Sequence, residues 1–427
     1  MAYTIPKGLF DILPQTKEEW RTASRWQYLE NILHAAAADY GFKEIRTPIF
    51  EKTELFVRSV GESSDIVSKE MYTFPDKKGR SMTLRPEGTA PVIRAYIEEQ
   101  LHQISGESKF YYIGPMFRYD RPQAGRYRQF HQFGAEAIGV GTPEQDVEMI
   151  DFLCEIFRRL GLKNLTVHIN SVGDAETREV YREKLAEFLE PHKGSLSEDS
   201  KARLEKNVLR ILDSKDLDDQ KLLEGAPSLL DFLSLEAKTH FERVQTLLKL
   251  LGIPFVVDPN LVRGLDYYTH TVFEVMSDKL GAQNTIGAGG RYDGLLATLG
   301  GPALPSCGFA TGLERVLHTM ESEGSSFPPP RNPDLFLIPM GEKALEACLN
   351  KGTYLRHQGW SVEIELSGKK IQYGLKRANE LHAKFCAVVG ERELASQQIE
   401  VKEMALHTAS AVNWNDLETF LKMRRSL

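Results

Sequence analysis

The segment FRYDRPQAGRYRQFHQ carries four arginines within eleven residues, at positions 118, 121, 126 and 128. A guanidinium group presents a fixed fork of donors that matches the oxygens of a phosphate. Arg118 belongs to an apolar stretch, where an unpaired charge would be costly. We therefore favour phosphate binding by this cluster over the alternative, an exposed hairpin with ion pairs.

A second candidate is GFATGLERV, which reads as a strand running into a helix. Gly308 and Gly312 would let a flat ring approach the backbone closely. Arg315, near the helix start, could cover that ring or bind phosphate. Alternatively, Arg315 is an exposed helix residue beside Glu314.

Two further segments carry weaker signals. In LVRGLDYYTHTVFE we expect a strand, whose neighbouring residues face opposite ways, so that only part of Arg263, Asp266, Tyr267 and Tyr268 can share a pocket. GAGGRYDGLLATLGG lacks the Lys-Ser/Thr ending of a phosphate-binding P-loop and is expected to form a tight turn. Glu87 and Glu136 flank expected strands and could bind an amino group, although such residues are more often paired or on the surface.

Several classes of protein are disfavoured. The sequence has no HExxH or GxSxG motif, and its four cysteines form no CxxC pair. The net charge of −7 argues against indiscriminate coating of nucleic acid, so a polyanion would be held by local basic sites. We expect a cytoplasmic protein without a membrane segment, since no apolar run of about 18 residues and no secretory leader is present.

The elements that must position these residues follow from periodicity and turn residues. We expect a helix over 17–40, with Thr16 and Glu19 at capping-box spacing and Gly41 after its end. Pro48 places FKEIRTPIF at a sheet edge or an interface. We further expect a hairpin around 76–79, a helix entered at 89–91, two strands flanking the arginine cluster, and a helix from Thr142–Pro143 to Gly161.

The second half of the chain divides into three segments of different composition. Residues 174–251 are polar, acidic and helical, which indicates an insertion. Strand texture returns after it, and SEGSSFPPPRNPD is a linker. Beyond the linker, strands and helices alternate, which predicts an α/β domain with a largely parallel sheet. The predicted division is 1–173 and 251–325 for one domain, 174–250 for the insertion and 332–427 for the last domain.

The motifs and their order resemble those of the histidyl-tRNA synthetases, a family of class II aminoacyl-tRNA synthetases. The long helix with FKEIRTPIF resembles motif 1, the arginine segment motif 2 and GFATGLERV motif 3, while LVRGLDYY and AGGRYDGL resemble the two histidyl signatures. The resemblance implies an α+β catalytic domain on an antiparallel sheet with a helical insertion, plus a C-terminal α/β anticodon-binding domain. It also implies ATP with Mg²⁺, L-histidine, a histidine tRNA and a homodimer.

The same resemblance implies roles for individual residues. Arg118 and Arg263 are expected to be catalytic at the α-phosphate, and Arg118, Arg126, Arg128 and Arg315 to bind ATP. The histidine-binding set is expected to comprise Glu87, Thr89, Gln132, Glu136, Arg263, Tyr267, Tyr268 and Tyr292. No protein ligand to a metal is assigned.

Two alternatives stay open at this point. A catalytically inactive, synthetase-like regulatory subunit would be expected to lack the ATP arginines and the C-terminal domain, both of which are present. A synthetase for another amino acid conflicts with RGLDYY and AGGRYD.

Overall fold

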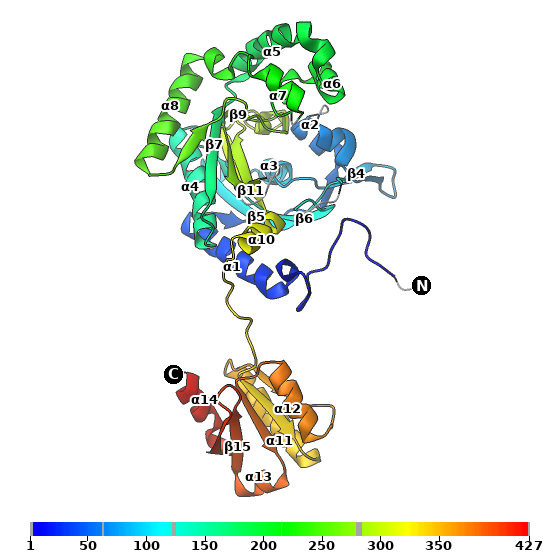
Figure 1. The fold of residues 1–427 in the computed structure, drawn as a ribbon, viewed down its shortest axis with the longest axis vertical. Coiled ribbons are helices and arrows are strands. Elements are labelled where there is room, and N and C mark those ends of the chain that lie inside the picture. The colour runs from blue at the N-terminus through cyan, green and yellow to red at the C-terminus, as the bar shows by residue number, and fades with distance from the viewer. Residues whose placement is uncertain (1–2, 62–63, 122–124, 215, 279–283, 426–427) are drawn as a thin grey trace. The chain divides into compact units, whose positions relative to one another are not determined.

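The computed structural model describes residues 3–61, 64–121, 125–214, 216–278 and 284–425 (Figure 1). The chain divides into two compact units, Met1–Phe327 and Pro328–Leu427. The division falls within the stretch predicted to be a linker, where residues 325–333 form neither helix nor strand. Within the described residues, no helix combines the length and apolarity that a membrane span requires.

The first unit is built on an eight-stranded sheet. Its strands are antiparallel except at the two edges, where β1 pairs with β5 and β7 with β8 in parallel. The order across the sheet is β1 (Lys43–Glu44), β5 (Ser108–Phe117), β6 (Gln129–Ile138), β11 (Ser306–Gly312), β10 (Thr285–Arg291), β9 (Thr269–Ser277), β7 (Leu165–Ser171) and β8 (Phe255–Val257). The expected antiparallel platform is therefore confirmed in its central strands.

Two segments of this sheet region differ from the predictions. The Gly-rich segment begins as strand β10, turns at Asp293–Gly294 and then enters the short helix α9 (Leu295–Thr298), and the glycines of β10 are needed for close packing. A Cβ on Gly289 would lie 2.2 Å from the Gly308 carbonyl oxygen, and one on Gly290 would lie 2.6 Å from that of Thr271. Conversely, residues 258–268 are not a strand but a loop that leads into β9.

Helices cover both faces of the large sheet. Buried side chains of α1 (Ala23–Asp39), α4 (Pro143–Arg159), α8 (Leu235–Leu250) and α10 (Leu313–Ser322) pack together with one face in the main hydrophobic core. A second core joins α3 (Thr89–Glu98) and the short α9 (Leu295–Thr298) to residues 181–229. The helix predicted from Thr142–Pro143 is confirmed as α4, and Gly161 follows it with φ of +77°.

The first helix begins later than predicted. Thr16 and Glu19 do not form a capping box, because the backbone around Thr22 is extended and pairs with Leu13. A short 3-10 turn, Glu19–Arg21, precedes α1. The apolar stripe itself is confirmed, since the side chains that form it within α1 are buried: Trp26, Leu29, Leu33 and Ala36.

A three-stranded sheet holds the segment after α1. Its order is β2 (Phe50–Lys52), β4 (Ser81–Leu84) and β3 (Thr73–Pro75), and the β3–β4 hairpin lies where it was predicted. The helix α2 (Thr53–Val60) follows β2. Arg85, 6% exposed, donates to the carbonyl oxygens of Thr47 and Pro115 and so ties this segment to β5.

The predicted insertion is helical, as expected; its first three helices share one core, whereas the last, α8, packs with α4 (Figure 1). Its helices are α5 (Ala175–Leu189), α6 (Glu198–Lys206), α7 (Leu217–Leu223) and α8. Asp219 is fully buried and accepts hydrogen bonds from the hydroxyls of Ser197, Ser200 and Ser214. These hydrogen bonds fix the turns between the helices, whose surfaces are otherwise strongly charged.

The second unit is an α/β domain with a mixed sheet. Its order is β13 (Val362–Ile364), β12 (Leu335–Pro339), β14 (Phe385–Val389), β15 (Gln398–Glu403) and β16 (Thr408–Asn413). The first three strands are parallel, but β15 and β16 are antiparallel. The prediction of a largely parallel sheet is therefore correct only for β13, β12 and β14. Its helices are α11 (Glu342–His357), α12 (Ile371–Glu380), α13 (Glu391–Ser396) and α14 (Leu417–Arg425).

Candidate functional site

A pocket of about 290 Å³ lies over the large sheet. The end of β5, the start of β6, the loop 258–268, β10 and the β11–α10 junction all contribute to its lining. Ten of the residues singled out from the sequence line it together, although they span more than two hundred positions of the chain: Glu87, Thr89, Arg118, Arg126, Gln132, Arg263, Tyr267, Tyr268, Tyr292 and Arg315. We refer to the part formed by Glu87 and Glu136 as the acidic floor. The part with Arg118, Arg126, Arg263 and Arg315 is the arginine end.

Glu87 is one of two buried carboxyl groups of the acidic floor. Its side chain is 4% exposed and accepts hydrogen bonds from the backbone N–H groups of Thr89 (2.7 Å) and Ala90 (3.0 Å). These donors belong to the first turn of α3, where the helix dipole favours a negative charge. Burial raises the pKa of Glu87, whereas those N–H groups and Arg118 oppose the rise.

Glu136 lies beneath the lining and completes the floor. It accepts hydrogen bonds from the hydroxyls of Thr89 (2.7 Å), Tyr112 (3.4 Å) and Tyr292. Burial raises its pKa to about 8, with a further rise from the nearby Glu87, while its three donors pull in the other direction. At neutral pH this carboxyl therefore holds a proton that it can share with a ligand.

Tyrosine rings form one wall above the floor. Tyr267 and Tyr268 lie 4.8 Å apart between ring centroids, and Tyr292 lies 5.5 Å from Tyr267. Both tyrosines of the pair reach the pocket, contrary to the strand-based expectation, because a loop is not bound to alternate its side chains. Arg263 comes from the same loop.

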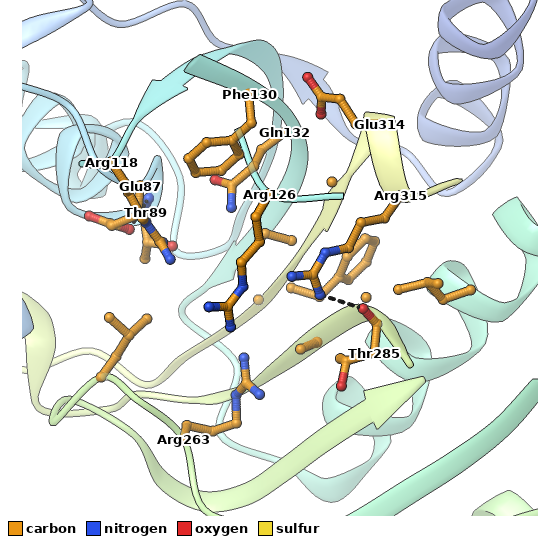
Figure 2. Close-up of a pocket in the computed structure, with 18 of the residues that line it drawn as sticks. Glu87, Thr89, Arg118, Arg126, Phe130, Gln132, Arg263, Thr285, Glu314 and Arg315 are labelled. Carbon is orange, nitrogen blue, oxygen red and sulfur yellow. Dashed lines mark hydrogen bonds between the residues drawn. The ribbon is translucent and has the colours of Figure 1, made fainter. Parts of the chain in front are cut away.

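The arginine end gathers four guanidinium groups from different elements, shown in Figure 2. Arg118 donates from Nε to the Pro86 carbonyl oxygen (2.8 Å) and lies over the Phe130 ring. Arg315 donates to the carbonyl oxygens of Gly125 (3.2 Å) and Thr285 (2.8 Å). Burial, together with repulsion from Arg126, Arg118 and Arg263, lowers the pKa of Arg315 to about 10.

The other two arginines have carboxylate partners. Arg126 lies 3.2 Å from Asp120, and Arg263 forms an ion pair with Glu274 of β9. In Figure 2 the side chains of Arg126 and Arg263 point toward each other across the pocket. These two carboxylates offset only part of the charge of four guanidinium groups, so this end of the pocket is suited to phosphate.

Two buried polar atoms of the lining have no hydrogen-bond partner in the described part of the chain. They are the acceptor Gln132 Oε1 and the donor Arg263 Nε. Buried polar groups are normally paired, so an unpaired acceptor and an unpaired donor in one pocket are a reason to expect a ligand there.

One predicted ATP residue lies apart from the pocket. Arg128 is absent from the lining and instead stacks over the Tyr119 ring, 4.0 Å from its centroid. The tip of the same hairpin, including Pro122, lies outside the described residues.

Sequence reasoning missed several lining residues. Tyr112 faces the floor from β5, and a Cβ on Gly88 or Gly134 would lie about 2.2 Å from its ring. Gly88 precedes α3 and Gly134 lies in β6, so only the folded structure shows that these glycines make room for the Tyr112 ring. Glu314, set aside as a helix neighbour of Arg315, is 2% exposed and accepts from the backbone and ring nitrogens of His131.

The described residues contain no group of three His, Cys, Asp or Glu side chains that could enclose a metal ion. The carboxylates that do line the pocket are Glu70, Glu87, Asp120 and Glu314. Magnesium bound with a nucleotide usually takes one or two carboxylates and completes its shell with phosphates and water. The donor set thus fits a metal ion that arrives with a nucleotide.

Comparison with known proteins gives matches over both units. Residues 8–316 match the family model described as histidyl-tRNA synthetase, and residues 334–424 match the model of the anticodon binding domain. A histidine–tRNA ligase of Protochlamydia amoebophila is 53% identical, covering 99% of this chain and all of the relative. One from a Geobacillus species is 48% identical over the full length of both chains.

Solved structures agree. The crystal structure of apo histidyl-tRNA synthetase from S. aureus has a TM-score of 0.84 and 41% sequence identity, and it covers 99% of this chain and 100% of that chain.

Proposed function

The chain belongs to the histidyl-tRNA synthetase family and charges tRNA with histidine, and from this premise we propose that the pocket over the large sheet is where ATP activates the amino acid. The observation that carries the proposal is the pairing, in one pocket, of an acidic floor with four converging guanidinium groups. Histidine offers an ammonium group and an imidazole to the first, and ATP offers phosphates to the second.

We assign histidine to the acidic floor. Glu87 and the unpaired Gln132 Oε1 are acceptors suited to the ammonium group, with Thr89 beside them. Neutral imidazole has one donor and one acceptor nitrogen, so it can be read by the Glu136 carboxyl and the tyrosine hydroxyls. A pocket that hydrogen-bonds both nitrogens rejects apolar look-alikes strongly, because its buried polar groups would be left unpaired.

We assign the triphosphate to the arginine end. In the first step, a histidine carboxylate oxygen attacks the α-phosphorus, a P–O bond forms, and the bond to the β-phosphate oxygen breaks to release pyrophosphate. Negative charge grows on the phosphoryl oxygens, and prepositioned guanidinium groups stabilise it. Arg118 and Arg263 take this role, while Arg315 and Arg126 hold the nucleotide.

In the second step a ribose hydroxyl at the tRNA 3′ end attacks the carbonyl carbon of histidyl-adenylate. An ester bond forms, AMP leaves with the electron pair of the broken C–O bond, and the proton of the ribose hydroxyl is released to solvent. We propose that the second unit binds the anticodon stem of a histidine tRNA, which its match to the anticodon binding domain supports. Arg128, which is not part of the pocket lining, is then available to the tRNA rather than to ATP.

Mg²⁺ is proposed to enter with ATP, and Asp120 and Glu314 are the carboxylates of the lining that would help to hold it. It would supply further charge neutralisation for the phosphates. The chain's own arginines remain the groups that orient the α-phosphate.

A homodimer and a cytoplasmic location complete the proposal. Exposed apolar side chains cluster on the three-stranded sheet, where Phe50 is 46% and Phe74 is 39% exposed and their rings lie 6.1 Å apart between centroids. Exposed apolar patches of this kind commonly mark interfaces between proteins. The four cysteines are all free thiols, which fits a reducing compartment.

Histidine-dependent exchange of pyrophosphate into ATP tests the assignment. Wild-type protein should exchange with histidine and with no other amino acid of a standard panel. Arg263→Ala should reduce kcat by about 10²–10³, the usual cost of removing one donor that stabilises transition-state charge. Unchanged exchange in a folded Arg263→Ala variant would refute the proposed role, and exchange with another amino acid alone would refute the substrate.

A further inference from the structure

The loop 258–268 carries Arg263, Tyr267 and Tyr268 into the pocket but has no helix or strand of its own. Loops of this kind are held in place by side-chain contacts from neighbouring elements. The contacts that hold this one come from the helical insertion and from α2.

Arg178, on the first turn of α5, donates from its guanidinium to the backbone carbonyl oxygen of Tyr268. It is half-buried, and burial together with Arg182 lowers its pKa. The nearby carboxylate of Asp174 is already engaged, since it accepts from the Thr177 N–H (2.7 Å) and the Ser234 hydroxyl (2.7 Å). The Arg178 guanidinium therefore binds a main-chain carbonyl oxygen of the loop.

A second contact lies two residues earlier in the loop. Asn207, which follows α6, donates from Nδ2 to Asp266 Oδ1 (3.0 Å). On the opposite side, the Asp266 N–H donates to the Val60 carbonyl oxygen at the end of α2 (3.3 Å). The loop is therefore bracketed between α2 and the insertion.

The Tyr268 side chain is confined as closely as its backbone. A Cβ on Gly290 of β10 would lie 2.9 Å from Cδ1 of the Tyr268 ring. The ring thus rests directly on the strand, and movement of the Tyr268 backbone would displace it from the pocket wall. Arg263, five residues earlier, would move with the loop.

We propose that Arg178 is a positioning residue for histidine activation, which through the Tyr268 carbonyl fixes the loop that presents Tyr268 and Arg263 to the pocket. The inference rests on the proposed function, because it takes those two side chains to act on histidine and its carboxylate. It gives the insertion a part in the first chemical step.

The test is a comparison of pyrophosphate-exchange kinetics for wild type, Arg178→Ala, Arg178→Lys and Arg182→Ala. Arg178→Ala should lower kcat/KM for histidine by about 10²-fold, the usual cost of a misplacement of about 1 Å, with KM for ATP changed less than about 3-fold. Arg178→Lys keeps a cationic donor and should fall between wild type and Ala. Arg182→Ala removes an exposed charge one turn further along α5 and should resemble wild type.

Several results would overturn the inference: an unchanged kcat/KM for histidine in Arg178→Ala, an equal loss for ATP, a Lys variant no better than Ala, or an equal loss in Arg182→Ala. Arg263→Ala, measured alongside, distinguishes a failure of the positioning role from a failure of the proposed function. If Arg263→Ala is inactive and Arg178→Ala is normal, the positioning role alone fails. If Arg263→Ala is normal, the proposed function of the pocket fails.

Discussion

The two ends of the pocket are built in opposite ways. On the acidic floor, each carboxyl group has several donors from the protein: Glu87 has two backbone N–H groups and Glu136 has three hydroxyls. At the arginine end, Arg118 donates to the Pro86 carbonyl oxygen, and Arg315 donates to those of Gly125 and Thr285. The carboxyl groups of the floor are held by uncharged donors, whereas the arginine end brings four cationic groups to one side of the pocket.

Electrostatics sharpen the contrast. Burial raises the pKa of Glu136 to about 8 and, with the neighbouring arginines, lowers that of Arg315 to about 10. Each end therefore disfavours its own charged state, and each would be relieved by a group of the kind that histidine or ATP supplies. Such charge complementarity before binding is how a site gains specificity for a zwitterion and a polyanion at once.

The largest expected effect separates two arginines that are partners across one hairpin, since the Arg118 N–H donates to the Arg128 carbonyl oxygen (2.9 Å). Arg118→Ala should reduce kcat/KM for pyrophosphate exchange by about 10³, as loss of a transition-state donor does. Arg128→Ala, whose side chain lies outside the pocket lining, should stay within about 5-fold in the same assay. Equal losses of kcat/KM in the two variants would contradict the placement of Arg118 in the pocket lining and of Arg128 outside it.

A smaller effect is expected at the floor. Glu87→Gln keeps the shape of the side chain but removes the charge that we propose binds the ammonium group, so KM for histidine should rise by about 10². KM for ATP, measured at saturating histidine, should change less than about 3-fold. A rise confined to ATP would place Glu87 at the wrong end of the pocket.

Tyr292 and Tyr112 provide a matched pair, because both hydroxyls donate to Glu136 but at different lengths. Tyr292→Phe should raise KM for histidine by about 10-fold, the cost of a hydrogen bond to a charged or proton-sharing group. Tyr112→Phe loses only the 3.4 Å contact and should stay within about 3-fold. A larger rise in KM for Tyr112→Phe than for Tyr292→Phe would show that Tyr112, not Tyr292, makes the more important hydrogen bond to Glu136.

The smallest expected effect is on stability. Because the pKa of Glu136 is raised to about 8 in the folded state, its contribution to stability is fully present below its ordinary value near 4.5. That contribution is lost as pH rises toward 8, since the unfolded chain ionises first. Between pH 5 and 8, wild type should lose at least about 1 kcal/mol more of unfolding free energy than Glu136→Gln, as measured by urea denaturation. Parallel pH profiles would contradict the raised pKa.

The sequence predicted well where one side chain pattern maps onto one element. The stripe of Trp26, Leu29 and Leu33 and the Thr142–Pro143 start both follow from local geometry. It predicted poorly where tertiary packing overrides local preference. Gly289 and Gly290 are weak strand formers, and they lie in β10 because neighbouring backbone and the Tyr268 ring occupy the space of a Cβ.

The candidate site divides in the same way. Charged and aromatic residues of distinctive motifs could be named in advance, including Arg118, Arg263 and Arg315. Tyr112 could not, because on β5 it is one of several aromatic residues and only the fold shows which faces Glu136. The contact from Arg178 to the Tyr268 carbonyl likewise joins segments 90 residues apart and leaves no trace in local sequence.

The most direct test of the two-ended pocket is equilibrium binding of each substrate alone, by calorimetry, to wild type, Glu87→Gln and Arg315→Ala. We expect a crossed result: Glu87→Gln loses affinity for histidine by at least about 10-fold and keeps that for ATP, and Arg315→Ala does the opposite. Loss of both ligands in either folded variant, or of the wrong ligand in both, would contradict the division of the pocket into an acidic floor for the amino acid and an arginine end for the nucleotide.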